Sequence, residues 1–459
     1  MQENHRRRLG ALAAISAALI GTALAAPPAA TAAPSAARHG KTVLVTAGLR
    51  GELANGDSYG QSVTPNGRYV VFTSVADNLV RNATNGQHNI FVRDLRTGIT
   101  RLASVGYHGV PADGGNFEPS ISAHGRYVAF ESFAGNLMKS ATATSPNVFV
   151  RDLVKHVTIQ VSVGLSGEAT SGGGLSPSIS GDGSKVAFVS YATDIVAGDT
   201  NNAGDIFVWN RRTRKTIRVS VGPGGVQSDP TVTGQEPFGS RSSSDPKFSA
   251  NGNVVAFTSF ATNLVAGDTN GGSDVFVRNL KKKTTTRVSV ATGGGQAFGG
   301  YKEFGSRGAK ISGDGDVIIF DSFANGLVPT TRNHMDDVYV HFVRANRTEL
   351  LETTDDGALS VQGVNGAAVS VDGRYLAFST ADTNVVPGDA NGKSDVFLRD
   401  LRKGTTRLVV LAADGSQTDG DNGSPSISSR GKVVVFASTA DNLLPGLSGG
   451  ASALFAHRI

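Results

Sequence analysis

A short pattern of hydrophobic and glycine positions recurs seven times along this chain. Each copy has an apolar run that ends in Phe five residues after a Gly, and a second apolar run whose aromatic residue follows that Phe by 19 positions. The first aromatic residues are Phe72, Phe130, Phe188, Phe257, Phe320, Phe378 and Phe436. The second are Phe91, Phe149, Phe207, Phe276, Tyr339, Phe397 and Phe455. A spacing that never changes predicts one small folding unit repeated seven times.

Each repeat is expected to form four short strands, A to D. Strand A contains Ser-Ile-Ser, as at 120–122, and a tight turn with Gly, such as Gly183, joins it to strand B. Strands B and C are almost continuously apolar, so both of their faces must be covered. Strand D is expected at positions such as 218–221. Four-stranded sheets packed face to face in a closed ring satisfy this demand. The pattern therefore predicts an all-β, seven-bladed β-propeller over residues 41–459.

The two ends of the repeat region predict how the ring closes. The last repeat stops at Ile459 and lacks a strand D, whereas an unassigned strand-like segment, 42–47, precedes the first repeat. We expect this N-terminal strand to complete the last blade, which removes two free sheet edges.

The repeat motifs resemble those of a known family. Ser180-Gly181-Asp182-Gly183, followed by Lys185-Val186-Ala187-Phe188 and then by Asp205-Ile206-Phe207-Val208, is similar to the TolB-type, WD40-like propeller repeat. The resemblance covers nearly all of residues 42–459 and implies a propeller fold, but no particular function. TolB itself has six blades and an additional α/β domain, so its partners are not carried over to this chain.

Composition and the N-terminal segment indicate an exported protein. The chain has 58 Gly, no Cys and a net charge of only +5, which excludes disulfides and cysteine chemistry and gives no electrostatic footprint for nucleic acid. Arg6 to Arg8, an apolar run and Ala23-Leu24-Ala25 are typical of a secretory signal over residues 1–25, with a cut as late as residue 32 as an alternative. Residues 26–40 are expected to be an Ala/Pro-rich linker. No membrane span is expected after the signal is removed.

Two enlarged connections are the first candidate binding site. The connection between successive repeats is longer only before and after blade four. Both longer connections contain the sequence Phe-Gly-Ser-Arg. Connections from D to A and from B to C share one face of a propeller, at the mouth of the channel, and loops on a rigid scaffold often carry function. The arginines are candidates for binding an anion, and the phenylalanines are candidates for the apolar walls of the site. The alternative is that each Arg only stabilises its own loop through contacts within that loop. The candidates are Arg241, Arg307, Phe238, Phe304, Glu236 and Glu303.

The B-to-C connections offer a second candidate, a calcium site. The motif D-x-N-x-x-x-D occurs in blades three, four and six, and its side-chain oxygens are the ligands that calcium prefers. The other blades form loops of the same length without these carboxylates, which favours an Asx-turn over calcium. The residues are Asp199, Asn201, Asp205, Asp268, Asn270, Asp274, Asp389, Asn391 and Asp395.

Catalytic motifs are weak. Residues 446–450 match G-x-S-x-G without the expected strand-to-helix elbow, and the histidines are scattered without a metal-binding pair. The single Trp, Trp209, is expected to pack within its blade rather than to bind sugar. The sequence thus favours a secreted, non-catalytic binding module with an unidentified protein or anionic glycan partner and no cofactor other than possible calcium. The alternatives are an extracellular polysaccharide lyase or hydrolase, and a structural cell-surface module.

Overall fold

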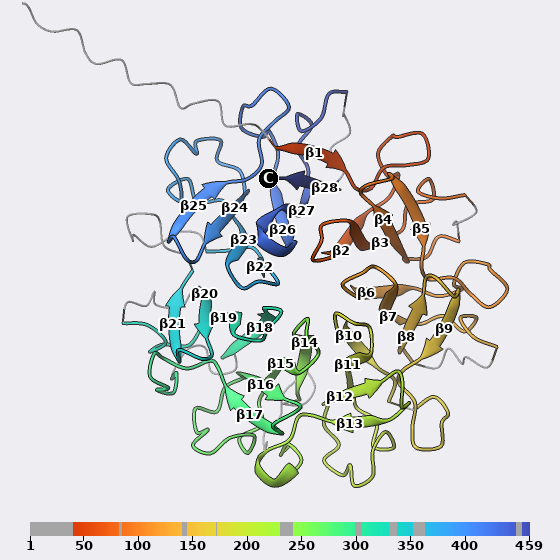
Figure 1. Cartoon of the computed structure of the whole chain (residues 1–459), viewed down its shortest axis with the longest axis vertical. Helices are drawn as coiled ribbons and strands as arrows, with labels where there is room; N and C mark the ends of the chain where they lie inside the picture. Colours follow the sequence, from red (N-terminus) through yellow and green to blue (C-terminus); the bar gives the residue numbers. More distant parts are fainter. Residues whose placement is uncertain are drawn as a thin grey trace, which may run out of the picture. The chain divides into compact units, whose positions relative to one another are not determined.

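The chain forms seven blades around a central channel (Figure 1). The computed structural model describes residues 40–81, 85–139, 145–170, 172–229, 242–298, 305–329, 337–351, 363–446 and 452–459. Each blade is one antiparallel sheet of four strands, and the first strand of each repeat lies innermost. The predicted all-β, seven-bladed propeller is therefore confirmed.

The strands follow one another as a meander within each blade. Blade one has β2 (Ser58–Val63), β3 (Tyr69–Ser74), β4 (Asn89–Asp94) and β5 (Ile99–Leu102). Blade two has β6 (Asn116–Ile121), β7 (Tyr127–Ser132), β8 (Asn147–Asp152) and β9 (Val157–Gln160). Blade three has β10 (Leu175–Ile179), β11 (Lys185–Ser190), β12 (Asp205–Asn210) and β13 (Thr216–Arg218). Blade four has β14 (Ser244–Phe248), β15 (Val254–Ser259), β16 (Asp274–Asn279) and β17 (Thr284–Arg287).

The remaining blades repeat this arrangement. Blade five has β18 (Ser306–Ile311), β19 (Val317–Ser322), β20 (Asp337–Phe342) and β21 (Arg347–Leu350). Blade six has β22 (Ala367–Val369), β23 (Tyr375–Thr380), β24 (Asp395–Asp400) and β25 (Thr405–Leu408). Blade seven has β26 (Asn422–Ile427), β27 (Val433–Ser438), β28 (Ala453–Arg458) and β1 (Lys41–Leu44). Two short 3₁₀ turns, η1 (Pro223–Gly225) and η2 (Ser429–Gly431), complete the assigned elements.

The repeated aromatic residues form the core between blades. In every blade the first aromatic residue pairs directly with the second across the two central strands, and the ring centroids are 5.5 to 6.1 Å apart. Phe188, for example, is fully buried in a cluster that combines side chains of blades two and three. This packing confirms the role of the central strands, because both of their faces are covered by neighbouring blades.

Two strand boundaries differ from those expected. Strand A begins earlier, at Asn116 in blade two, and contains a bulge whose residue, Glu118, has a φ of +49°. Strand D ends earlier, at Arg218 in blade three. The Val219 N–H still donates to the Ile206 carbonyl, but the Ile206 N–H donates to Ser220 Oγ instead of a backbone carbonyl, and this Oγ donates to Asp205. The expected strand at 218–221 is therefore displaced: the observed strand, 216–218, starts two residues earlier and ends three residues earlier.

The N-terminal strand closes the ring as predicted. Strand β1 pairs antiparallel with β28, with Lys41 opposite Arg458 and Leu44 opposite Phe455. The Val45 N–H then donates to the Leu454 carbonyl, and Val45 is fully buried. Blade seven thus consists of segments from both ends of the described chain.

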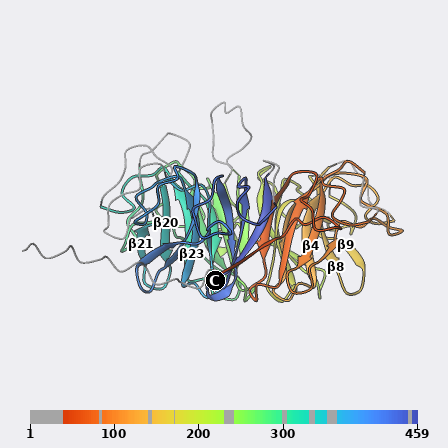
Figure 2. The same ribbon diagram turned by 90° about the horizontal axis from the view of Figure 1, so that it is seen from above.

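The two faces of the propeller carry different connections (Figure 2). Because the strands alternate in direction, the A–B and C–D turns share the face on which the C-terminus lies, and the B–C and D–A connections share the other. Neighbouring A–B turns are hydrogen-bonded to each other: Ala123 donates to Gly181, and Gly181 to Ala250. These bonds narrow the channel at the turn face.

The expected signal and nearly all of the linker, residues 1–39, lie outside the described residues. Within the part of the chain that is described, no helix is long and apolar enough to cross a membrane.

Candidate functional site

The structure places one of the six predicted binding residues. Arg307 lies at the start of β18, the innermost strand of blade five, rather than in the preceding connection as expected. Its guanidinium carbon is 4.9 Å from the centroid of the Phe323 ring. The other five lie outside the described residues: Arg241, Phe238, Glu236, Phe304 and Glu303.

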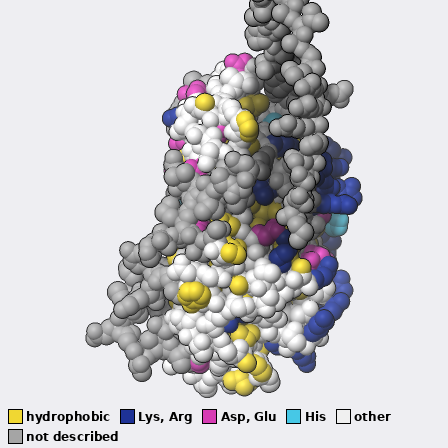
Figure 3. Space-filling model, turned by 90° about the vertical axis from the view of Figure 1, so that its left-hand side faces the viewer, with side chains coloured by type: hydrophobic (Ala, Val, Ile, Leu, Met, Phe, Trp, Pro, Cys, Tyr) yellow, Lys and Arg dark blue, Asp and Glu magenta, His cyan; other side chains and the backbone are white. Residues whose placement is uncertain are grey.

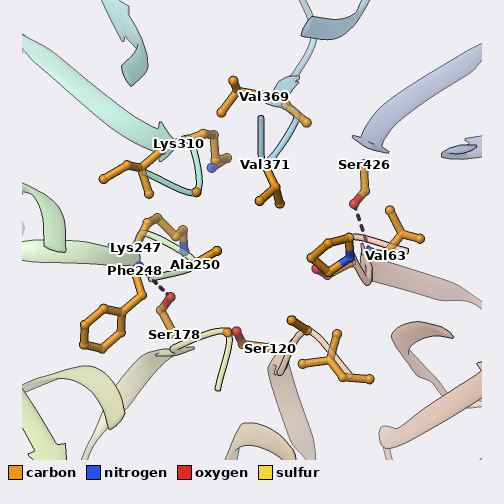
Figure 4. Close-up of a pocket in the computed structure, with 18 of the residues that line it drawn as sticks. Val63, Ser120, Ser178, Lys247, Phe248, Ala250, Lys310, Val369, Val371 and Ser426 are labelled. Atoms are coloured by element: carbon orange, nitrogen blue, oxygen red, sulfur yellow. Dashed lines mark hydrogen bonds between the residues drawn. The ribbon is translucent and has the colours of Figure 1, made fainter. Parts of the chain in front are cut away.

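The central channel contains a feature that the sequence analysis missed. One position on each innermost strand faces, across the sheet, the residue before the repeated Phe, and it lines the channel. Four blades have Ser at this position and blade six has Ala, but blades four and five have Lys247 and Lys310. In ring order the residues are Ser62, Ser120, Ser178, Lys247, Lys310, Ala368 and Ser426. Two cations therefore lie on neighbouring strands of the channel wall (Figure 4).

The serine at this position joins one blade to the next. Ser178 Oγ accepts the Phe248 N–H at 2.9 Å, and Ser120 Oγ accepts the Ile179 N–H at 3.1 Å. Ser426 Oγ accepts the Val63 N–H in the same way across the closure of the ring. A lysine side chain has no acceptor, so Lys247 and Lys310 do not serve this structural purpose.

Neither ammonium group is neutralised by direct contact. Among the described residues, neither Lys247 Nζ nor Lys310 Nζ has a hydrogen-bond or ion-pair partner, although both side chains are half-buried. Burial lowers the pKa of Lys310, and the charge of Lys247 lowers it further, while Asp245, Asp321 and Glu118 oppose the shift. Two like charges held together in a partly desolvated channel favour the arrival of an anion.

The space beside the lysines is large enough for a small ligand group. Lys247 and Lys310 both line a cavity of about 240 Å³ at the turn end of the channel. Lys310 also lines a cavity of about 410 Å³ nearer the mouth, together with Asp321, Gln61 and Pro425. The walls of both cavities are otherwise mostly Val, Ile, Ala and Gly, so polar recognition is concentrated at a few groups.

The D-x-N-x-x-x-D loops of blades three and four hold an arginine between their carboxylates. Arg218 Nη1 is 2.9 Å from Asp199 and 3.2 Å from Asp205. Arg287 repeats this arrangement in blade four, with distances of 2.9 and 3.3 Å to Asp268 and Asp274. The guanidinium thus supplies the positive charge that the hypothesis assigned to calcium.

In the same loops the Asn forms the expected Asx-turn. The amide nitrogens of Asn201, Asn270 and Asn391 donate to the Asp at the start of the following strand, at 2.9 to 3.0 Å. Their amide oxygens accept a backbone N–H two residues further on. An amide nitrogen aimed at the carboxylate is the geometry of a turn, since a metal ligand would present oxygen.

Blade six has no arginine at this position, because Leu408 replaces it. Asp389 instead accepts a hydrogen bond from Gln417, and Asp395 accepts bonds from Asn391, Thr418 and Asn422. Burial raises the pKa of Asp395 to about 6. A folded-state pKa above the unfolded value means that this group's contribution to stability is lost as the pH rises through about 6.

These contacts predict how the protein responds to calcium. We expect a chelator to leave the melting temperature unchanged, because protein donors already bind the carboxylates of all three loops. The measurement is thermal unfolding with EDTA and with added calcium. Stabilisation that approaches ~2.7 kcal/mol at a hundred times the dissociation constant would instead show a specific site.

Other candidates from the sequence do not join a site. Within the described ranges no group of three His, Asp or Glu side chains is arranged to hold a metal ion. Trp209 is only 1% exposed and lies within the core of blades two and three, as expected for packing. The signal that identifies the channel lysines is present in the sequence: aligning the repeats on the Ser that ends strand A places Lys247 and Lys310 two residues before it.

Comparisons with known proteins support the fold. No protein-family model matches the chain. No curated protein matches its sequence. Among solved structures, an oligogalacturonate lyase in complex with manganese is 12% identical, with a TM-score of 0.50, over 92% of this chain and 98% of that one. The β-propeller domain of the Trilobed protease from Pyrococcus furiosus is 12% identical, with a TM-score of 0.49, over 88% of this chain and 94% of that one.

TolB from Acinetobacter baumannii is also similar, at 14% identity and a TM-score of 0.35, over 81% of this chain and 76% of that one. The repeats whose motifs resemble those of TolB fold into propeller blades, as that resemblance implies. This chain is a seven-bladed β-propeller whose repeat motifs resemble those of the TolB type.

Proposed function

We propose that the protein is a non-catalytic binding module that holds an anionic group of its ligand in the central channel, against Lys247 and Lys310. One observation carries this proposal: two lysines without a partner among the described residues replace, in adjacent blades, the serine that joins blades elsewhere. A half-buried cation without a direct ion-pair partner costs stability, and a ligand that supplies such a partner would explain its presence.

The rest of the channel is consistent with a ligand that enters from the mouth. Arg307 starts the same strand that carries Lys310, and the cavity beside Lys310 extends toward that end. The two enlarged connections precede β14 and β18, the strands that carry the two lysines. The binding site predicted from these connections and the channel site therefore belong to the same two blades. Because residues 1–25 have the pattern of a secretory signal, we also propose that the protein works outside the cytoplasm.

The test replaces each lysine by the residue that other blades use. We expect Lys247→Ser and Lys310→Ser each to weaken binding of an acidic ligand by ~1.5 to 3 kcal/mol, the range for a charged hydrogen bond. The same substitutions are expected to maintain or raise the melting temperature, since they remove a half-buried charge and place an acceptor beside the N–H of the next blade. Lys393→Ser is the matched control, because Lys393 is exposed on a B–C connection.

The ligand screen uses short oligosaccharides that carry uronate, sialate or phosphate groups, with neutral oligosaccharides for comparison. Calorimetry on the best binder gives the affinities, and chromatography of the recovered ligand reveals any turnover. Equal binding by the double lysine variant would refute the channel site. Cleavage of the ligand would refute the non-catalytic part and favour the alternative of a polysaccharide-active enzyme.

A further inference from the structure

A patch of six basic side chains lies on the turn face, on outer turns, whereas the channel lysines lie on the innermost strands. It is formed by the C–D turns of blades three and four, between β12 and β13 and between β16 and β17, which are neighbours in the ring (Figure 1). We name it the basic patch; its residues are Arg212, Arg214, Lys215, Lys281, Lys282 and Lys283. All six are exposed, and none forms a side-chain hydrogen bond or ion pair with the residues that the structure describes.

The net charge of the chain conceals this patch, because it sums the charges of all parts of the surface. Figure 3 shows Lys and Arg side chains gathered along one edge of the disc. Many acidic groups, including those of the D-x-N-x-x-x-D loops, lie on the B–C connections of the opposite face. A total of +5 therefore does not describe the field at either face.

Blades three and four lack the Asp–Arg pair that blades one, two and six place beside this turn. In blade one Asp94 ends strand C and pairs with Arg68 at 2.7 Å, and in blade six Asp400 pairs with Arg374 at 2.6 Å. Hydrogen bonding to these arginines lowers the pKa of each of the two carboxyl groups to about 2. The charge of such an Asp is thus present, and already neutralised, at any physiological pH.

Asparagine takes the place of this Asp in the basic patch. Asn210 and Asn279 end strand C in blades three and four, and their amide oxygens accept the N–H of Arg212 and of Lys281. Asp94 accepts the N–H of Arg96 in the same way. The turn therefore keeps its cap and loses its negative charge.

The backbone also favours a different residue at two of the basic positions. Arg214 and Lys283 have φ angles of +59° and +56°, in the left-handed region. Gly98 and Gly404 hold the equivalent place in blades one and six, each with a φ of +70°. A side chain there is disfavoured relative to Gly, so the two cations are present at some expense of stability.

We propose that the basic patch binds an extended acidic polysaccharide. Six exposed cations spread over two adjacent turns suit repeated anionic groups along a chain more than one small ligand. Arg214 and Lys215 also line a cavity of about 640 Å³, which could receive one group of such a chain. A flat bilayer fits less well, because the A–B turns of this face carry exposed Asp182, Asp314 and Asp372. A chain that crosses only the outer turns avoids these carboxylates.

Nucleic acid fits less well for a different reason. Single strands are held by bases that stack on aromatic side chains, and the patch presents none. Trp209 is buried beneath Arg214, whose guanidinium carbon is 5.4 Å from the indole centroid. The proposal is independent of the channel site, which lies on the innermost strands and takes a small anionic group.

The experiment uses alginate, a long polyuronate, as the probe, with neutral dextran as its control. Wild-type protein is expected to bind alginate, to bind longer chains more tightly, and to lose affinity as salt rises. Arg214→Gly/Lys283→Gly installs the residue that blades one and six use, and should weaken binding by about tenfold at low salt and make the salt dependence shallower. Its melting temperature should stay equal or rise.

Two comparisons make the result decisive. Arg402→Gln/Lys403→Gln removes two charges from the equivalent turn of blade six, which lies outside the basic patch, and should leave alginate binding unchanged. Lys393→Ser, which removes an exposed charge from a B–C connection of the opposite face, should also leave it unchanged. Equal binding by the Arg214→Gly/Lys283→Gly variant, no preference for alginate over dextran, or tighter binding to duplex DNA or to phosphatidylglycerol vesicles than to alginate would overturn the proposal.

Discussion

Replacing Phe188 by Ala is expected to destabilise the protein by ~3 to 5 kcal/mol, the cost of removing a large buried aromatic side chain and leaving a cavity. Phe188 has no exposed surface, and its ring centroid is 5.7 Å from that of Phe207. The side chain packs in a cluster with Tyr127 and Val150 of the preceding blade, so the cavity would loosen the contact between two blades as well as the sheet itself.

Urea unfolding followed by fluorescence and circular dichroism measures this loss. Phe133→Ala is the matched control: Phe133 follows the corresponding strand of blade two by one residue, is 45% exposed, and should lose much less. Equal unfolding midpoints for the wild type and the Phe188→Ala variant would mean that the interface between blades contributes little to stability.

Deleting residues 40–47 is expected to open the ring and to cause aggregation. The deletion removes β1, which provides the outermost strand of blade seven, and with it the buried Val45. Strand β28 then presents a free edge of unpaired N–H and carbonyl groups, which other chains can extend. A lower melting temperature and multimers in size-exclusion chromatography with light scattering are the expected results.

A chain that begins at residue 40 is the control for this deletion, since residues 40–459 form one compact unit. If the shortened chain without 40–47 remained a monomer with an unchanged melt, the closure would be dispensable for stability.

The sequence predicted the architecture well because the fold is a repeated local unit. The spacing from Gly183 to Phe188 and on to Phe207 indicates a turn, two central strands and the pairing of these strands. All of these features lie within one blade. The closure was predictable for a similar reason, because a repeat without its last strand requires a substitute. The strand boundaries were harder to predict. Strand D ends where Ser220 Oγ, instead of a backbone carbonyl, accepts the Ile206 N–H, and such a hydrogen bond has no signature in the hydrophobic pattern.

The candidate sites depend on contacts between repeats, which a single repeat does not report. The significance of Lys247 and Lys310 lies in the ring, where neighbouring innermost strands bring them to one part of the channel wall. The loop motif alone did not predict the contacts of Arg218 and Arg287, because each Arg lies 13 residues beyond the Asp that it contacts at the start of strand C. The residue on the adjacent outer strand decides whether a guanidinium contacts the two carboxylates of the loop.

The closure by β1 also means that the chain could begin at another blade and still form the same ring. Lys41 and Arg458 are direct partners in adjacent strands, so their Cα atoms are separated by only about 5 Å. A short peptide would therefore join residue 40 to residue 459, and new termini at an exposed turn such as that around Gly404 would give a circularly permuted protein with the same seven sheets. Such a permutant could present either end of the chain at a chosen blade, which makes the propeller suitable for fusions beside the channel or beside the basic patch.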